Sequence, residues 1–137
     1  MRNWLLWKLA LQLVVAILAV IPVFAGLAGV WSGPGFVKLE NPWPADLDSH
    51  FRFLSGVFVA VGIGWFSCIP EIENKTNRFR FLATLTFAGG LARLLPLFLV
   101  GPPSIGHLSG LCIELVVVPL LVFWQSVIRR CNAQPTP

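Results

Sequence analysis

Four long apolar runs occupy most of this sequence, and each is long enough to cross a membrane as a helix. They cover about residues 5–30, 51–69, 79–100 and 105–128. An α-helix rises about 1.5 Å per residue, so roughly 20 residues cross a hydrocarbon core of about 30 Å. With 56% of its residues hydrophobic and 12% charged, the chain is too apolar for an ordinary soluble domain. We therefore expect residues 1–137 to form a single all-α domain, an integral membrane four-helix bundle.

The first apolar run has a second interpretation, a cleavable signal peptide. Arg2 and Lys8 resemble the basic start of such a peptide, and the small residues in 24–28 offer a cleavage site. The run continues past that site to about residue 30, and the later spans fit an inside start. A retained helix is therefore the favoured interpretation.

The segments between the apolar runs are short, with one exception. Residues 31–49 contain glycines, prolines and three acidic residues, and they form the longest polar connection, which we assign to an outer loop. The connections at residues 70–78 and 101–104 are too short to be domains, and Ser104 is a suitable N-cap for the fourth span. Short connections favour antiparallel neighbours, so the sequence predicts an up-down-up-down arrangement.

Basic residues at the ends of the apolar runs predict the orientation of the chain. If the N-terminus is cytoplasmic, seven lie inside, while Lys38 and Arg52 lie outside. The inner seven are Arg2, Lys8, Lys75, Arg78, Arg80, Arg129 and Arg130. This bias favours an N-in and C-in protein of the cell inner (plasma) membrane. The formal charge of +4 thus indicates topology, and we expect no nucleic acid among the partners.

Two spans carry stripes of small residues at helical spacing. The first-span stripe consists of Gln12, Ala16, Ala19 and Val23. The second-span stripe consists of Gly56, Ala60 and Gly64, flanked by Ser55 and Val59. Small side chains let helix backbones approach closely, so we expect helix contacts along both stripes.

Two charged residues, Arg93 and Glu114, lie deep inside the third and fourth apolar runs. A charge at membrane depth costs several kcal/mol, so it normally faces the bundle interior and has a partner. At about 1.5 Å per residue, Arg93 lies roughly 10 Å and Glu114 roughly 13 Å below the boundary at the outer turn. Because the two spans are consecutive and antiparallel, we predict a direct contact between Arg93 and Glu114 in the outer half of the bundle.

Further polar residues would surround this pair in the predicted bundle. His50, Arg52 and His107 would lie above it, nearer the outer surface, with Thr86 and Gln12 farther in. Together they would line a polar pocket that opens toward the outer loop. Arg52 has a second interpretation, in which its side chain extends to the outer headgroups.

No motif in the sequence indicates catalysis or a cofactor. Cys68, Cys112 and Cys131 match no metal-ligand spacing, and we interpret them as small apolar filler or reduced thiols. The sequence also contains no nucleophile motif and no glycine-rich phosphate loop. We therefore expect neither a metal nor a cofactor.

Four short motifs, taken in order, carry a resemblance to a known family. They are Arg-Phe-Leu-x-Gly (Arg52 to Gly56), Gly-Gly-x-x-Arg-Leu (Gly89 to Leu94), Gly-x-Pro-Ser (Gly101 to Ser104) and Glu-Leu (Glu114-Leu115). In this combination, nearly the whole chain resembles an uncharacterised bacterial family of small four-helix membrane proteins, domain of unknown function 4345. The family pattern has an acidic residue at the position of His50 and often one at Val100, so this chain lacks two carboxylates. The resemblance implies fold and topology but no activity, because the family has none established.

Three classes of function fit these features. The favoured class is a non-enzymatic membrane protein, either an accessory subunit or a bundle that binds a lipid or small apolar molecule, with Arg93 and Glu114 fixing the helix register. The second is a proton-coupled or small-solute transport component that works as an oligomer, with Glu114 and His107 exchanging protons. The third is a membrane enzyme that acts on a lipid. Expected partners are the lipid bilayer, a lipid or small apolar ligand, and further copies of the chain or a larger membrane complex.

Overall fold

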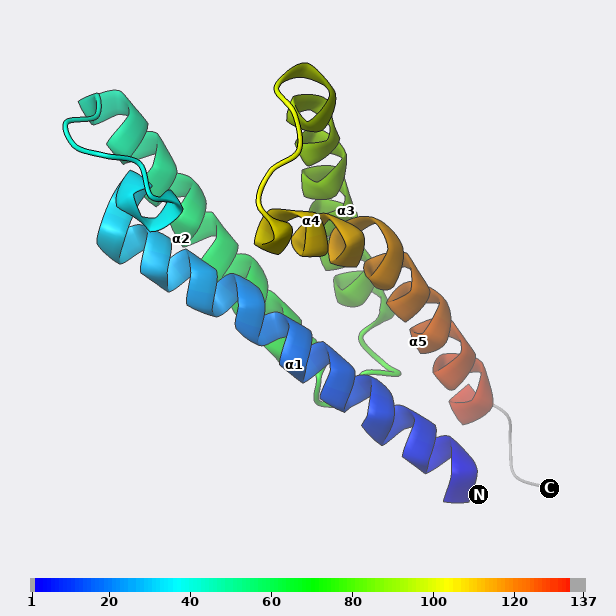
Figure 1. Cartoon of the computed structure of the whole chain (residues 1–137). Helices are drawn as coiled ribbons and strands as arrows, with labels where there is room; N and C mark the ends of the chain where they lie inside the picture. Colours follow the sequence, from blue (N-terminus) through cyan, green and yellow to red (C-terminus); the bar gives the residue numbers. More distant parts are fainter. Residues whose placement is uncertain (1, 134–137) are drawn as a thin grey trace. The chain divides into compact units, whose positions relative to one another are not determined.

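The computed structural model describes residues 2–133, and most of them are helical (Figure 1). The α-helices are α1 (Arg2–Ser32), α2 (Ala45–Cys68), α3 (Thr76–Leu99), α4 (Ile105–Cys112) and α5 (Val118–Ala133). Two short elements accompany them, the 3₁₀ helix η1 (Gly33–Val37) after α1 and the π-helical turn η2 (Ile113–Val117) between α4 and α5. The described residues contain no strand, so the all-α prediction is confirmed.

Four helical segments are long and apolar enough to cross a membrane. They are Trp4–Val37, Ala45–Cys68, Thr76–Leu99 and Ile105–Asn132. Each corresponds to one predicted span, and the fourth combines α4, η2 and α5. The prediction of four membrane-length helices is therefore confirmed.

Large apolar side chains point outward on all four segments. Phe24, Phe53, Phe98 and Phe123, one from each segment, are 66% exposed or more. Exposed apolar surface on this scale marks contact with a membrane or another protein. The outward phenylalanines therefore fit helices that are surrounded by lipid chains.

The helix α2 begins at Ala45, inside the segment that the sequence predicts as the outer loop. Pro44 directly precedes the helix, and Asp46 and Asp48 lie in its first turn. Carboxylates are favourable there because the N-terminal end of a helix carries a partial positive charge. The first turn of α2 is polar, so the apolar run used to predict the second span begins only at about residue 51, after the observed start of the helix.

The chain divides into two compact units. One unit consists of Gln12–Ile69, and it contains most of α1 together with η1 and α2. The other contains the first turns of α1, up to Leu11, and the chain from Pro70 onward. The helix α1 therefore supplies residues to both units.

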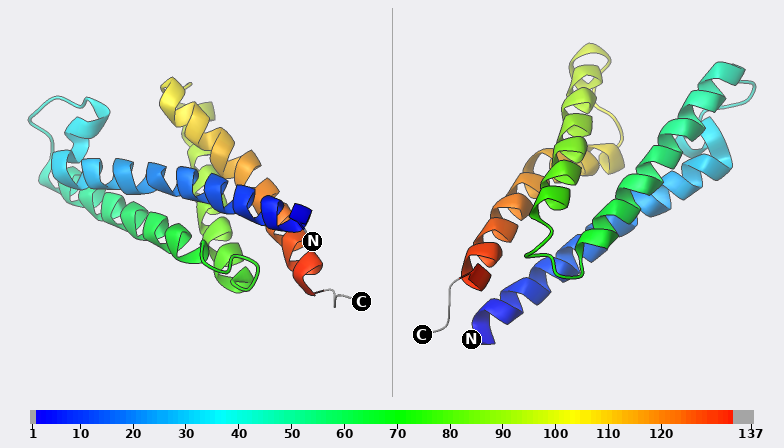
Figure 2. Two further views of the ribbon diagram at one scale, coloured as in Figure 1. Left: turned by 90° about the horizontal axis from the view of Figure 1, so that it is seen from below. Right: turned by 180° about the vertical axis from the view of Figure 1, so that it is seen from behind.

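In the unit of Gln12–Ile69, α1 and α2 form an antiparallel pair, which we call the first hairpin (Figure 2). A Cβ atom added to Gly26 would lie 2.7 Å from the carbonyl oxygen of Ser55 and 2.8 Å from the amide nitrogen of Val59. Real Cβ atoms do not approach main-chain atoms so closely. The two backbones can therefore meet at Gly26 only because it has no side chain.

The predicted stripes of small residues are confirmed in part. Ala19 and Val23, from the first-span stripe, face Gly62. A Cβ atom added there would lie 3.0 Å from the Val23 amide nitrogen and 3.2 Å from the Ala19 carbonyl oxygen. The prediction for Gly56 is wrong for this hairpin, because an added Cβ atom would have no atom within 4 Å. The contact face of α2 includes Ser55 and Val59, the residues predicted to flank this stripe, and Ser55 is rotated by about 100° from Gly56.

In the other unit, α3 packs against η2 and α5, and we call α3 with α4–η2–α5 the second hairpin. Phe79 and Ile72 are fully buried in its core. Trp7, from the first turns of α1, meets Trp124 of α5 edge to face, with ring centroids 5.7 Å apart and planes at 78°. This is a favourable geometry for an aromatic pair, so it ties the start of α1 to α5.

Candidate functional site

The predicted contact between Arg93 and Glu114 is present in the second hairpin. Arg93 Nη1 lies 3.5 Å from Glu114 Oε1, and the two side chains are 40% and 10% exposed. Arg93 belongs to α3 and Glu114 to η2, on consecutive spans as predicted. Glu114 Oε2 is buried and has no hydrogen-bond partner among the described residues. Only one of the two carboxylate oxygens of Glu114 therefore has a partner.

Glu114 lies in a π-helical turn at which the fourth span changes direction (Figure 1). The amide of Val118 donates to the carbonyl of Ile113, five residues back, whereas an α-helix would direct it to Glu114. The next residue, Pro119, has no amide hydrogen. The main-chain carbonyl of Glu114 thus receives neither its α-helical nor its π-helical hydrogen bond. Such turns are frequent at functional sites.

Two glycines make room for the ion pair. A Cβ atom added to Gly90 would lie 2.9 Å from Glu114 Cβ and 2.8 Å from Leu115 Cδ2. A Cβ atom added to Gly110 would lie 3.1 Å from Arg93 Nη1. Gly90 and Arg93 are three residues apart, so they lie on the same side of α3. The Gly-Gly-x-x-Arg sequence therefore brings the backbone of α3 close to Glu114 and directs the guanidinium to the same place.

A cavity of about 310 Å³, which we call the Arg93 cavity, lies where α3 ends and the turn to α4 begins. Its lining consists of Arg93, Pro96, Leu97, Val100 and residues 101–103. Arg93 is the one charged residue in this lining, and the others offer aliphatic surface and main-chain groups. The cavity therefore suits an apolar group that carries a hydrogen-bond acceptor.

Arg52, in the first hairpin, holds α1 and α2 together. Its guanidinium bonds to Asp48 twice, from Nε to Oδ2 at 2.8 Å and from Nη2 to Oδ1 at 3.2 Å. Its Nη1 donates to the main-chain carbonyls of Val30 and Trp31 at the end of α1. The indole of Trp43 donates to the same aspartate. Arg52 thus satisfies terminal carbonyls of α1, which have no partners within their own helix.

Gln12 also acts at a helix end in the first hairpin. Its side-chain amide donates to the carbonyl of Ile69, the residue after α2, at 2.7 Å. His50 is exposed and lies near the start of α2. Of the predicted pocket residues in this hairpin, two therefore have structural hydrogen bonds to main-chain carbonyls.

Thr86 and His107 lie in the second hairpin. Thr86 Oγ1 donates to the carbonyl of Leu82 in its own helix at 2.9 Å. His107 is exposed, and its Nδ1 lies 2.9 Å from Ser104 Oγ. Ser104 occupies the predicted N-cap position, but its side chain pairs with this ring and caps no main-chain amide. The single pocket that would unite Thr86 and His107 with the residues of the first hairpin stays a prediction.

Sequence reasoning missed a second buried ion pair. Lys8 Nζ lies 2.6 Å from Glu73 Oε1, and the side chains are 17% and 8% exposed. From the sequence, Lys8 indicates only topology and Glu73 belongs to a short polar connection. The position of Lys8 inside an apolar run was the available signal, because a lysine there needs a partner as Arg93 does.

The chemistry available at the Arg93 cavity is that of an ion pair in apolar surroundings. No cluster of three or more histidine, cysteine, aspartate or glutamate side chains within residues 2–133 could hold a metal ion. Cys68 is buried, and Cys112 and Cys131 are exposed. Arg93 is the member of this ion pair that lines the cavity, so its guanidinium is the charged group that can hold a ligand there.

Comparison with known proteins identifies the family. A family model for a domain of unknown function (DUF4345) matches residues 10–125, which is most of the chain. No curated protein and no solved structure matches the chain. The matched residues include most of both hairpins, the Arg93–Glu114 pair and the Arg93 cavity. The chain belongs to the DUF4345 family.

Proposed function

We propose that this member of the DUF4345 family is a non-catalytic membrane protein that binds an amphipathic molecule in the Arg93 cavity. The polar end of the molecule accepts hydrogen bonds from the guanidinium, and its apolar end lies against the turn between α3 and α4. The observation that carries this proposal is a single half-exposed charge in an otherwise uncharged lining. Ligand sites commonly combine a mostly apolar wall with a few placed polar groups.

The geometry of the ion pair leaves Arg93 able to bind a ligand. An arginine has five N–H donors, and the contact with Glu114 is a single one at 3.5 Å. The remaining donors suit a carboxylate or phosphate oxygen, which arginine binds strongly. Glu114 compensates the charge of Arg93 while the cavity is empty and limits where the guanidinium can lie. Its role in this proposal is to position Arg93.

The size of the cavity limits what it holds. About 310 Å³ is at the lower end of the range for small-molecule sites, roughly 300–1,000 Å³. That volume accommodates a headgroup with part of a chain, and the rest of the chain would extend along the helices into the bilayer. A fatty acid or a single-chain lipid fits this description better than a large polar metabolite.

The test is a titration of the purified chain in detergent with dansylundecanoic acid, a fluorescent fatty acid. We expect saturable binding that weakens about tenfold in Arg93→Gln, because a hydrogen bond to a charged group contributes roughly 1.5–3 kcal/mol. Val100→Trp, which fills the cavity, should weaken binding similarly. Arg80→Gln removes an equal charge elsewhere on α3 and is the matched control. Unchanged affinity in both Arg93→Gln and Val100→Trp would refute the proposal.

A second candidate function, proton-coupled transport by an oligomer, uses the same residues. It is favoured by one observation, the buried Glu114 oxygen that has no hydrogen-bond partner. Vesicles containing the protein would then show a pH-dependent flux that Glu114→Gln abolishes. A flux equal to that of empty vesicles would exclude this function and leave the binding proposal intact.

The orientation and the cellular location belong to the same proposal. The basic residues at the ends of the spans support an N-in and C-in protein of the inner membrane. A C-terminal green fluorescent protein should therefore be fluorescent in cells, and a C-terminal alkaline phosphatase should be inactive. The reverse pattern would place the C-terminus outside.

A further inference from the structure

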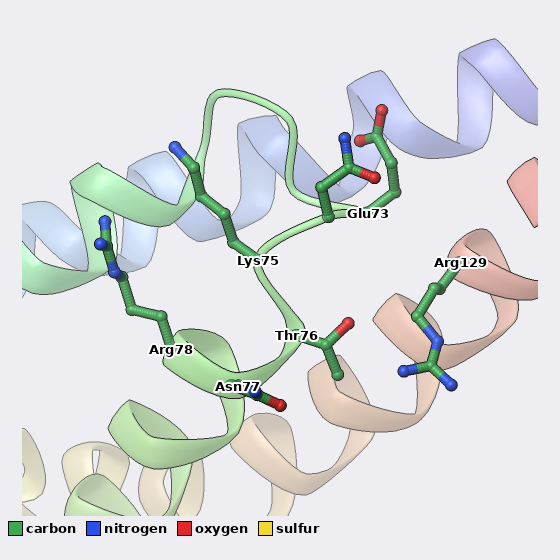
Figure 3. A pocket seen from close by; sticks show the side chains of 7 residues that line it. Glu73, Lys75, Thr76, Asn77, Arg78 and Arg129 are labelled. Carbon is green, nitrogen blue, oxygen red and sulfur yellow. The ribbon is translucent and has the colours of Figure 1, made fainter.

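A second cavity, of about 480 Å³, lies at the start of α3 (Figure 3). Three of its lining residues are basic, Lys75, Arg78 and Arg129, and one is acidic, Glu73. Arg129 comes from α5, and the other labelled side chains come from the segment before α3 and from the first turn of α3. We call it the α3-start cavity. Unlike the Arg93 cavity, it has a lining rich in charge.

The start of α3 adds to the positive potential of this cavity. The first amides of an α-helix have no partner within the helix, and they carry a partial positive charge. Lys75, at the N-cap position, makes no side-chain hydrogen bond to them, and the first turn contains no acidic residue. The combination of amides and basic side chains is typical of sites for phosphate groups.

Buried hydrogen bonds hold Arg129 beside this helix start. The side-chain amide of Gln125 is fully buried and donates to the carbonyl of Ile72 and to Thr76 Oγ1, at 3.0 Å in each case. Arg129 follows Gln125 by one turn of α5. Arg129 forms no ion pair with any other of the described residues. The Gln125 hydrogen bonds therefore fix the backbone of α5 beside α3, and the exposed Arg129 guanidinium is available to a ligand there.

A second observation, independent of the basic residues, points to a ligand in this cavity, and it concerns Glu73. It is 7% exposed and its Oε1 pairs with Lys8. Its Oε2 is buried and has no hydrogen-bond partner within residues 2–133. A buried carboxylate oxygen without a donor is costly, and it would accept a hydrogen bond from a ligand in the cavity that Glu73 lines.

We propose that the α3-start cavity binds a phosphate ester whose head also carries a hydrogen-bond donor. The phosphate lies against Arg129 and the first amides of α3. The donor, a hydroxyl or an ammonium, reaches Glu73 Oε2. A membrane lipid headgroup and a soluble phosphate ester both offer this chemistry. This site is separate from the Arg93 cavity, since Thr76 and Arg93 are about 25 Å apart along α3 at 1.5 Å per residue.

The first test compares lipids that differ in the donor. Native mass spectrometry of the full chain in detergent would measure the binding of phosphatidylglycerol, phosphatidylethanolamine and phosphatidylcholine. We expect the first two to bind and phosphatidylcholine to bind about tenfold more weakly, because its trimethylammonium has no hydrogen to donate. Equal binding of all three lipids would overturn the role of Glu73.

The second test compares two adjacent arginines. Arg129→Gln should weaken the binding of phosphatidylglycerol about tenfold, because it removes a charge-assisted bond to phosphate. Arg130→Gln removes the same charge one residue away, outside the cavity lining, and should change binding less than about twofold. Equal losses in the two variants would overturn the site, and neither variant touches the Arg93 cavity.

The third test identifies the source of the phosphate and confirms the role of Glu73. Glu73→Gln should reduce the preference for phosphatidylglycerol over phosphatidylcholine, and an unchanged preference would overturn its role. Because Glu73 also pairs with Lys8, circular dichroism would check that the variant is folded, while the arginine comparison tests the site without it. Glycerol phosphate that displaces phosphatidylglycerol at equal concentration would support the site with a soluble ester as ligand; failure to displace would support the lipid.

Discussion

Arg52 in α2 and Arg93 in α3 are exposed to the same extent, 40% of each side chain, yet they bond very differently. Arg52 donates to both oxygens of Asp48 and to two main-chain carbonyls. Arg93 has one ion-pair contact, at 3.5 Å, with a carboxylate whose other oxygen has no partner among the described residues. Arg52 is a structural cap, whereas Arg93 retains donors that a ligand can use.

The same difference appears in how the two hairpins pack around glycine. At Gly26 in the first hairpin, an added Cβ atom would meet main-chain atoms of α2, which cannot move independently. At Gly90 in the second, it would meet side-chain atoms of Leu115 and Glu114. The Arg93 cavity and the α3-start cavity are both lined by residues of the unit that contains the second hairpin. The close main-chain contact at Gly26 and the two cavities described above thus belong to different units of this chain.

The largest predicted effect is that of adding a methyl group at Gly26. Gly26→Ala should lower the free energy of unfolding by about 2–3 kcal/mol, because overpacking against main-chain atoms forces the helices apart. Gly90→Ala should cost about 1–2 kcal/mol, since Leu115 can change rotamer and the contact with Glu114 Cβ, at 2.9 Å, requires only a small backbone shift. Titration with sodium dodecyl sulfate in mixed micelles would measure both. Gly56→Ala is the control and should cost nothing, and a larger loss at Gly90 than at Gly26 would reverse the comparison.

A smaller effect is expected from breaking the Arg93–Glu114 pair. Arg93→Leu should lower the free energy of unfolding by about 1–2 kcal/mol, because it leaves a buried carboxylate without a partner and the arginine that it removes is half-exposed. Glu114→Leu should cost less, since the half-exposed Arg93 can reach polar groups at the membrane surface. The double variant should recover most of the loss. Purely additive losses in this cycle would show that the two side chains do not interact.

The smallest effect distinguishes the two arginines directly. Arg52→Lys should lower the melting temperature, because a lysine cannot bond to Asp48 through two nitrogens and also to two carbonyls. Arg93→Lys should leave the melting temperature nearly unchanged, because its one contact depends on charge more than on shape. Thermal unfolding in detergent, followed by circular dichroism, would compare them. Similar decreases in both variants would mean that Arg93 is bonded as completely as Arg52.

Much of the fold could be predicted from the sequence because helices have a fixed rise. The similar depths of Arg93 and Glu114 on consecutive spans predict their contact, and the contact is present. The family motifs agree, since Gly90 of the Gly-Gly-x-x-Arg motif packs against Glu114. A helical repeat also identifies Ala19 and Val23 as contact residues, but it gave the wrong face for Gly56 because the rotation of α2 depends on packing.

The bonding of Arg52 could not be predicted because its acceptors are main-chain carbonyls. Every residue has such a carbonyl, so Val30 and Trp31 carry no sequence signal for this role. The Asp48–Arg52 spacing of four residues was a usable signal, since it brings the two side chains together on a helix. The Lys8–Glu73 pair was hidden for another reason, because it joins a helix to a turn far away in the sequence.

The π turn at Ile113–Val117 has a consequence for insertions and deletions in the fourth span. Its hydrogen bonds span one more residue than those of an α-helix. A one-residue deletion within the turn can be absorbed by converting it to α-helix, so α4 and α5 can both keep their contact faces. In the middle of α3 there is no π turn to convert, so a one-residue deletion must rotate all later residues of that helix by about 100°. The protein should therefore tolerate a one-residue deletion beside Glu114 better than one beside Arg93.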